Sequence, residues 1–260
     1  MNTGIEKLYY ERIKSLNIDH YAGEVSYYSK AGLRPAENSL LNSLPKGTKI
    51  LDVGCGSGRF SIEAAKRGFK VTGVDITPSA ITSCNAQAKK LKLSNAKFEV
   101  LDIVDERINE KFDYVFCPRF VINAIATKRS RKAAIKNIVN ACKPGGYVYV
   151  ESFNIWYVGK GPGAPIKNSL LVLYRSFKLN IYKILGLDYS GLFPGDIVYA
   201  ANKVATASQG YAHLPNVFEI RRYLKNSQTK SIYQIIGRKK HDWLKPFRYS
   251  IWVMAAVEND

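Results

Sequence analysis

Two carboxylates, Asp52 and Asp75, stand at the ends of two short apolar segments with a glycine-dense turn between them. Residues 50–53 suit a strand that is buried on both faces. Three glycines follow this strand at alternate positions: Gly54, Gly56 and Gly58. Glycines let a backbone turn sharply and approach a ligand that a Cβ would block. Asp75 lies about twenty residues beyond the turn, where nucleotide-binding folds place the acid that binds ribose hydroxyls. The spacing therefore predicts a nucleotide-binding corner.

The order of the glycines excludes two common nucleotide sites. Residues 54–58 read Gly-x-Gly-x-Gly, whereas dinucleotide-binding loops read Gly-x-Gly-x-x-Gly. No Gly-Lys-Ser/Thr follows the loop, which excludes the phosphate-binding loop of nucleotide hydrolases.

Residues 50–58 instead resemble motif I of the class I S-adenosylmethionine-dependent methyltransferases. Four further segments follow in that family's order: Asp75, Asp102 after residues 98–101, the strand-like residues 112–117, and residues 137–151 with their Lys-Pro-Gly-Gly turn. The resemblance covers residues 34–152. It implies a Rossmann-like α/β fold with a seven-stranded, mostly parallel sheet, S-adenosylmethionine as the cofactor and a methyltransferase activity.

The resemblance also implies which residues bind the cofactor. The glycines lie under it, Asp52 orders that floor, Asp75 binds the ribose and Asp102 faces the adenine amino group. Tyr28 and Arg34 are expected to contact its methionine end. The full set of expected cofactor residues is Asp52, Gly54, Cys55, Gly56, Gly58, Asp75, Ile76, Asp102, Ile103, Cys117, Tyr28 and Arg34.

The hydrophobic pattern predicts how these residues are positioned. Expected strands lie at 49–53, 71–75, 97–101, 112–117 and 146–151, and expected helices at 59–68, 78–92 and 128–143. The tail predicts a helix at 216–226 and antiparallel strands at 232–236 and 249–256. We therefore divide the chain into a helical leader (1–48), a cofactor-binding core (49–154), an inserted basic lid after the fifth strand (155–215) and a segment that completes the core (216–260).

The insertion contains a basic amphipathic helix. Six apolar side chains share about a third of the helical circumference: Leu170, Leu173, Tyr174, Phe177, Ile181 and Ile184. Attachment to an acidic membrane surface or to a polyanionic substrate is one interpretation. The interpretation we favour is a lid helix whose apolar stripe packs on the core, because most amphipathic helices are core helices.

The acceptor side has weaker signals. Methyl transfer from a sulfonium is an in-line displacement, which depends on positioning and on exclusion of water more than on a strong base. Asn123, Tyr211 and His213 are the expected catalytic residues, with a neutral His213 able to accept or orient a proton. A structural role for His213, capping the following helix, is equally open. Residues 117–120 lack the Asn/Asp-Pro-Pro-Tyr/Phe run of exocyclic amine methyltransferases, and Cys117 is more typical of an inert core thiol than of a nucleophile.

Charge indicates a class of partner. The net charge is +18, and from Tyr114 to Leu187 the only acidic residue is Glu151. Such a field attracts polyanions. The segment around Pro194–Asp196 and Gly210–Pro215 faintly resembles the tail of wobble-uridine tRNA methyltransferases, which favours tRNA as the acceptor. A basic surface without a polyanionic partner, a small molecule, sugar or isoprenoid lipid as acceptor, and a non-catalytic binding protein remain the alternatives.

The remaining composition predicts a cytoplasmic protein. The four cysteines lack metal-ligand spacing, so no metal site is expected and the thiols are expected to be reduced. Residues 1–7 show no secretory signal, and no run of 18 apolar residues occurs. Peripheral contact with a membrane stays compatible with this pattern.

Overall fold

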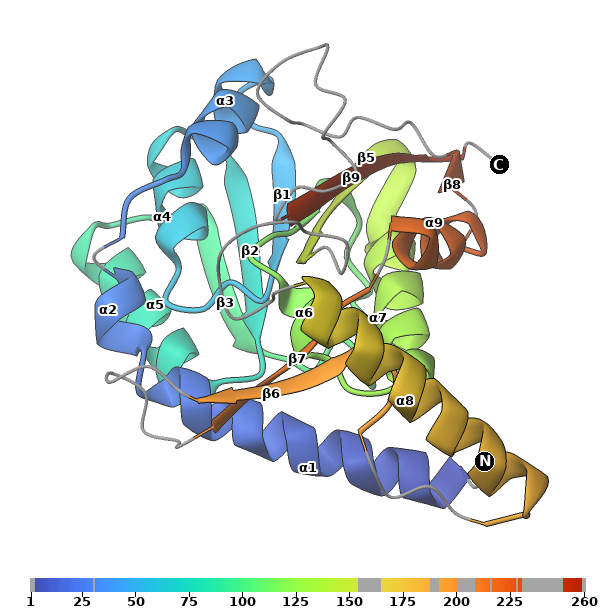
Figure 1. Cartoon of the computed structure of the whole chain (residues 1–260). Helices are drawn as coiled ribbons and strands as arrows, with labels where there is room; N and C mark the ends of the chain where they lie inside the picture. Colours follow the sequence, from blue (N-terminus) through green and yellow to red (C-terminus); the bar gives the residue numbers. More distant parts are fainter. Residues whose placement is uncertain are drawn as a thin grey trace.

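The fold is built on a seven-stranded sheet with the order β3-β2-β1-β4-β5-β9-β8 (Figure 1). The computed structural model describes residues 3–29, 31–153, 165–187, 192–200, 209–215, 217–227, 229–230 and 250–258. The strands are β1 (Lys49–Val53), β2 (Lys70–Asp75), β3 (Ala96–Val100), β4 (Phe112–Cys117), β5 (Cys142–Phe153), β8 (Thr229–Lys230) and β9 (Ser250–Val257). The first five pair in parallel, and β9 runs antiparallel to β5. The predicted α/β fold with a mostly parallel sheet is therefore confirmed.

Helices cover both faces of this sheet. They are α3 (Pro35–Ser43), α4 (Arg59–Lys66), α5 (Pro78–Lys90), α6 (Val121–Ala124), α7 (Lys128–Ala141) and α9 (Val217–Lys225). The core strands and helices begin within a few residues of their predicted starts. The largest difference is β5, which begins at Cys142 rather than 146, so the Lys-Pro-Gly-Gly run is part of the strand. The register against β4 shifts between Phe112 and Tyr114, which accommodates these extra residues.

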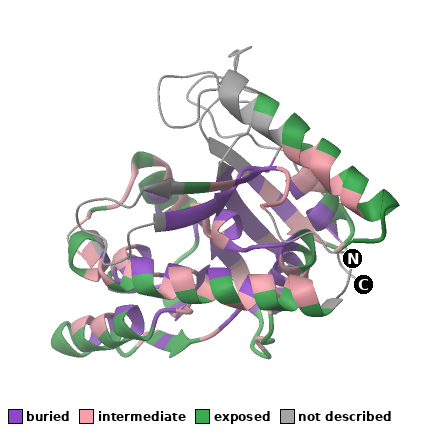
Figure 2. Ribbon diagram, turned by 60° about the horizontal axis from the view of Figure 1, so that its bottom comes forward, coloured by how far each residue is buried: buried purple, intermediate pink, exposed green. Residues whose placement is uncertain are grey.

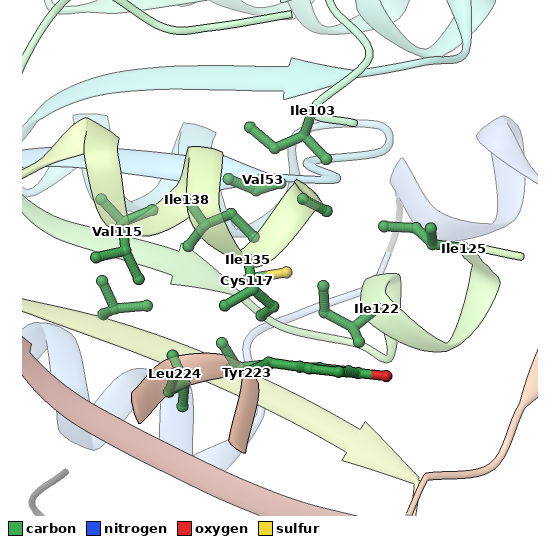
Figure 3. Packing of buried hydrophobic residues seen from close by; sticks show 14 of the residues in the cluster. Val53, Ile103, Val115, Cys117, Ile122, Ile125, Ile135, Ile138, Tyr223 and Leu224 are labelled. Atoms are coloured by element: carbon green, nitrogen blue, oxygen red, sulfur yellow. The ribbon is translucent and has the colours of Figure 1, made fainter. Parts of the chain in front are cut away.

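The core divides between the two faces of the sheet. On one face Ile135 and Ile138 of α7 pack with Val115 and Cys117 of β4 (Figure 3). Ile135 and Ile138 are three residues apart, so both lie on the buried side of the helix. On the other face Phe60, Phe116 and Tyr149 stack in a row, with centroid distances of 4.4 Å and 5.1 Å. Burial on both faces explains why the strands read as nearly continuous apolar runs.

Two segments that are far apart in the sequence lie side by side below the main sheet in Figure 1. One contains α1 (Thr3–Ala22) and α2 (Val25–Ser29), and the other is a two-stranded hairpin of β6 (Asp196–Ala200) and β7 (Gln209–His213). The hairpin was not predicted, because its short strands pair with each other and not with the main sheet.

In the tail, β8 pairs antiparallel with β9, so it runs in the same direction as the parallel strands. The strand predicted at 232–236 lies outside the described residues, so it stays a prediction.

The helix expected in the insertion is present as α8 (Pro165–Ile184), but the prediction that its apolar stripe packs on the core was wrong. All six side chains of the apolar stripe are exposed. Figure 2 shows α8 on the outside of the molecule with exposed residues along its length. Helical periodicity showed that the apolar side chains share a face, but it could not show which way that face turns.

Within the described ranges, no helix is long and apolar enough to cross a bilayer.

Candidate functional site

A cavity of about 470 Å³ opens at the carboxyl ends of β1 to β4. The strand order reverses between β1 and β4, and open α/β sheets bind their ligands at such a reversal. The volume lies within the roughly 300–1,000 Å³ typical of ligand pockets. The cavity is lined by eight of the residues expected to bind a cofactor: Asp52, Gly54, Cys55, Gly56, Asp75, Ile76, Asp102 and Ile103. Of the residues expected to act on the acceptor, Asn123 and Tyr211 line it.

The three glycines of the turn have different roles. All three have positive φ: +69° at Gly54, +54° at Gly56 and +79° at Gly58. A Cβ at Gly54 would collide with the Val121 side chain, and one at Gly58 would lie 2.9 Å from the Cys84 sulfur. A Cβ at Gly56 would meet no atom within 4 Å. Gly54 and Gly58 therefore allow close packing, whereas Gly56 borders the open cavity.

Asp75 links the end of β2 to the glycine turn. Its Oδ2 accepts the backbone N–H of Gly56 at 2.9 Å, and its Oδ1 accepts that of Thr77 at 2.9 Å. Burial raises the pKa of this carboxyl above its ordinary value, while these backbone donors act in the opposite direction. Each carboxylate oxygen has a second acceptor site. Asp75 can therefore hold the turn and accept two ligand hydroxyls at once.

Asp52 lines the cavity from the end of β1, and only one of its two carboxylate oxygens accepts a hydrogen bond from the described residues. The Ser61 hydroxyl donates to its Oδ2 at 2.6 Å. Among the described residues, its buried Oδ1 has no hydrogen-bond partner. Burial raises the pKa of Asp52 to about 7, against the opposing effect of the Ser61 hydrogen bond. An unpartnered buried carboxylate oxygen on a cavity wall suits a cationic or hydrogen-bond-donating ligand.

The helix α1 closes the side of the cavity around Asp102. The Tyr10 hydroxyl lies 2.8 Å from both carboxylate oxygens of Asp102, and the Lys14 ammonium lies 2.5 Å from Oδ2. Burial raises the pKa of the Tyr10 phenol, and the charge of Asp102 raises it further. Tyr10 and Lys14 were missed as site residues. Local sequence could not reveal the Tyr10–Asp102 contact, because it joins residues 92 positions apart.

Three expected cofactor residues that the structure describes, Arg34, Cys117 and Gly58, are not among the cavity-lining residues. Arg34 forms a bidentate pair with Glu151 at 2.7 Å and contacts Glu37 at 2.8 Å. Cys117 is fully buried in the core, where burial raises the pKa of its thiol. Gly58 packs against Cys84 as described above. The Tyr28 side chain lies outside what the structure describes, so its expected role stays a prediction.

The turn after β4 brings a cation and a ring to the cavity. Arg119 has a φ of +55° and Phe120 a φ of +66°, and both residues line the cavity. The backbone N–H of Arg119 donates to Glu151 Oε2 at 2.7 Å, which helps to hold the turn. Left-handed conformations of two successive non-glycine residues are costly and gather at functional sites. The side chain of Arg119 is exposed.

Behind the cavity wall, Asp196 organises a buried polar network. It accepts hydrogen bonds from the hydroxyls of Tyr211 at 2.8 Å and Tyr9 at 3.1 Å. His213 Nδ1 lies 2.8 Å from Asp196 Oδ1, and His213 Nε2 lies 3.4 Å from Glu219 Oε2. His213 is buried and absent from the cavity lining. Both of its ring nitrogens thus face carboxylates, and the network contacts the cavity through Tyr211.

Asn123 connects this network to the sheet. Its side-chain amide donates to the backbone oxygen of His213 at 2.5 Å and accepts the Ser152 hydroxyl at 3.2 Å. Arg131 of α7 is also part of this region: it donates to the backbone oxygen of Ile125 at 3.1 Å. Its guanidinium lies 3.4 Å from Glu219, whose pKa is held at about 2 by His213 and Arg131 despite the opposing effect of burial.

The sequence matches known methyltransferases through its core. The family described as "Methyltransferase domain" matches residues 44–178. The "Ubiquinone biosynthesis O-methyltransferase" of Coxiella burnetii is 30% identical over 145 residues, which are 55% of this chain and 51% of that protein. The "tRNA (carboxymethyluridine(34)-5-O)-methyltransferase" of Arabidopsis thaliana is 28% identical over 146 residues, 56% of this chain and 33% of that protein. The first of these matches thus spans about half of the relative's length.

Solved structures share the fold over a longer stretch. A methyltransferase of Methanosarcina mazei described as S-adenosylmethionine-dependent superposes with a TM-score of 0.59 at 23% identity, over 88% of this chain and 100% of that chain. The CcbJ methyltransferase of Streptomyces caelestis has a TM-score of 0.64 at 11% identity, over 93% and 99%. The family match covers more than half of the 260 residues. The chain therefore belongs to the methyltransferase-domain family, as its glycine turn and spaced carboxylates indicated.

Proposed function

We propose that this protein transfers the methyl group of S-adenosylmethionine to an acceptor carried on RNA, with tRNA as the first candidate. Three cavity features suit this cofactor. Gly56 leaves room for a ligand against its backbone, Asp75 has acceptor sites for two ribose hydroxyls, and Asp52 offers an unpaired oxygen toward a cation. When bound, the cofactor supplies an electrophilic methyl on a sulfonium. The protein's part is to position both substrates and to exclude water.

Cofactor affinity should depend on the ionisation of Asp52. Its pKa of about 7 means that a proton must leave when a cationic ligand binds at lower pH. Affinity should therefore rise with pH, by at most about tenfold per unit, and level off above about pH 7. Calorimetric titration with S-adenosylmethionine checks this. Asp52→Asn should flatten the dependence, and S-adenosylhomocysteine, which lacks the sulfonium charge, should show a weaker one. An equal slope in the Asn variant would contradict the assignment.

The observation that carries the RNA proposal is the strained turn at Arg119 and Phe120. It presents a guanidinium and an aromatic ring at the cavity. A guanidinium suits a phosphate, and an aromatic ring suits stacking with an unpaired base. An acceptor that joins a base to a phosphate would use both groups.

The helix that follows extends this positive region. Four exposed basic residues lie on α7, which contains no acidic residue: Lys128, Arg129, Lys132 and Lys136. The helix starts near the carboxyl end of β4, so its first turns lie on the cavity side of the sheet. Arg131 is not part of this surface, because it is buried beside Glu219.

Replacing these four residues together by Ala should reduce the salt dependence of tRNA binding. Each phosphate contact contributes roughly 0.7 to 0.9 to the slope of log affinity against log salt, so the slope should fall by about three units. Fluorescence titration over a salt series measures this. The matched control replaces four exposed lysines at the far edge of the sheet, which removes the same charge: Lys89, Lys90, Lys92 and Lys97. Equal slope changes in both variants would reject α7 as the binding surface.

The residues at the acceptor end receive different roles in this proposal. Tyr211 reaches the cavity, and Asp196 and burial together raise the pKa of its phenol, so it orients the acceptor rather than acting as a base. Asn123 positions β7 through the backbone oxygen of His213. His213 is a positioning residue that acts through Asp196, since its ring lies behind the wall.

Methyl transfer into fractionated cell material tests the acceptor class. Tritium from labelled S-adenosylmethionine should appear in RNA and remain after stringent washing. The tRNA activity in the name of the Arabidopsis relative supports this outcome. The second candidate acceptor is a small or isoprenoid molecule, supported by the ubiquinone pathway in the name of the Coxiella relative. Counts confined to the organic or small-molecule fraction would select it and reject RNA.

A further inference from the structure

We propose that α8 is a docking surface for an anionic lipid bilayer. Its outer face is the stripe of six large apolar side chains defined above, and two more exposed leucines, Leu185 and Leu187, follow the helix end. Phe177 is 67% exposed and Ile184 is 83% exposed. Single exposed apolar residues are ordinary, but six on one face of a helix are typical of an interaction site.

The charges beside the stripe indicate the chemistry of the partner. From Pro165 to Ile184 the helix has no acidic residue, and Lys178 and Lys183 lie on the polar side of the helix, off the apolar face. Lys183 is exposed. An apolar face combined with lysines on the polar face is the pattern of helices that lie in the interface of acidic membranes. The lysines would contact lipid phosphates while the apolar side chains enter the boundary of the acyl region.

Two other occupants fit these features less well. RNA matches the lysines, but its phosphate backbone offers nothing to cover six apolar side chains. A second copy of this chain would place two acid-free basic helices against each other, and like charges across an interface are costly. An acidic lipid surface satisfies the stripe and the charges together.

The helix is also fixed to the catalytic end of the fold. The Arg175 guanidinium donates to the backbone oxygen of Asp196, the residue that binds Tyr211 and His213. Docking through α8 would therefore hold the acceptor side of the cavity in a set orientation to the bilayer. The inference does not rest on the proposed RNA acceptor, because it uses only the outer face of α8.

Vesicle sedimentation of the full-length protein tests the proposal. We expect binding to vesicles of equal parts phosphatidylcholine and phosphatidylglycerol and little binding to phosphatidylcholine alone. Leu173→Asp with Phe177→Asp should lower the partition by about tenfold or more, because both side chains would otherwise enter the lipid boundary. The matched control is Leu8→Asp with Val100→Asp, two exposed apolar residues on α1 and β3. It should bind as the unmodified protein does.

A second pair of variants tests the charges. Lys178→Gln with Lys183→Gln should weaken binding to the anionic vesicles, whereas Lys132→Gln with Lys136→Gln on α7 should not.

Unmodified protein that stays in the supernatant with both vesicle types overturns the proposal. The proposal is also overturned if the variant with Leu173→Asp and Phe177→Asp sediments with the anionic vesicles as fully as the unmodified protein. Dimers that dissociate in that variant, without vesicle binding, would assign the stripe to a second copy. Methyl transfer to RNA in solution is a separate readout, so its failure leaves this test intact.

Discussion

Gly56→Val is expected to abolish cofactor binding while the protein stays folded. Gly56 has a φ of +54° and lines the cavity, and its Cβ direction is empty within 4 Å. A valine would place two methyl groups where the ligand must lie against the backbone. We expect an affinity loss of roughly a hundredfold or more, since each tenfold corresponds to about 1.4 kcal/mol of lost contact. Calorimetric titration with S-adenosylmethionine measures it, and circular dichroism checks the fold.

Backbone strain needs its own control, because a β-branched residue at positive φ costs about 1–2 kcal/mol anywhere. Gly47 has a φ of +79° and Gly68 a φ of +90°, both are exposed, and neither Cβ position has an atom within 4 Å. Gly47→Val and Gly68→Val should therefore lose similar stability and keep normal affinity. Native affinity in Gly56→Val would place the ligand elsewhere, and an equal affinity loss in a control would assign the effect to strain.

Glu37→Ala is expected to cause the largest loss of stability. Glu37 is fully buried and receives both terminal guanidinium nitrogens of Arg59 at 2.6 Å. It also accepts the backbone N–H of Arg34 at 2.8 Å and Nε of Arg34 at 2.9 Å. Its removal leaves Arg59, only 8% exposed, without this carboxylate. Removing one partner of a buried ion pair costs about 3–5 kcal/mol. We therefore expect the free energy of unfolding, measured by urea denaturation, to fall by about this amount.

The pH dependence of stability gives an independent check on the role of Glu37. The two arginines hold its pKa below the ordinary value, against the opposing effect of burial. A lowered folded-state pKa stabilises the protein above the unfolded value and loses this effect as the pH falls through the folded value. The difference between Glu37→Ala and the unmodified protein should therefore shrink below about pH 4.

Glu63 supplies the matched control for this prediction. It also has two cationic partners, Arg67 at 3.1 Å and Lys66 at 3.8 Å, but its side chain is 34% exposed. Glu63→Ala should cost less than about 1 kcal/mol, because water screens such pairs. Comparable losses in the two variants would show that burial adds nothing to the Glu37 cluster.

The position of the cofactor cavity followed from local sequence features. The apolar segments at 49–53 and 71–75 are buried strands whatever surrounds them, since few other structures satisfy such runs. A carboxylate that follows a parallel strand must lie at the same edge as its neighbours. Asp52, Asp75 and Asp102 therefore meet at one cavity, which needed no long-range information beyond the parallel order.

The acceptor end depended on contacts that no local pattern contains. Tyr9 and Asp196 are 187 residues apart, and their hydrogen bond exists because α1 lies beside the β6–β7 hairpin. Sequence reasoning gave His213 either a catalytic or a structural role, and in the structure its buried ring does not line the cavity but lies 2.8 Å from Asp196. Asn123 was placed at the cavity, but its bond to the backbone of His213 could not be predicted.

Local sequence by itself determined the strands, their flanking helices, the glycine turn and the three carboxylates, because hydrophobic periodicity and glycine conformation act over a few residues. Tertiary structure alone decided which charges are available. Arg131 and Lys132 are neighbours on one helix, yet the first is buried beside Glu219 and the second is exposed. It also decided that the apolar face of α8 turns outward. A residue's type and spacing state what it can do, but burial and partners depend on which distant segments pack against it.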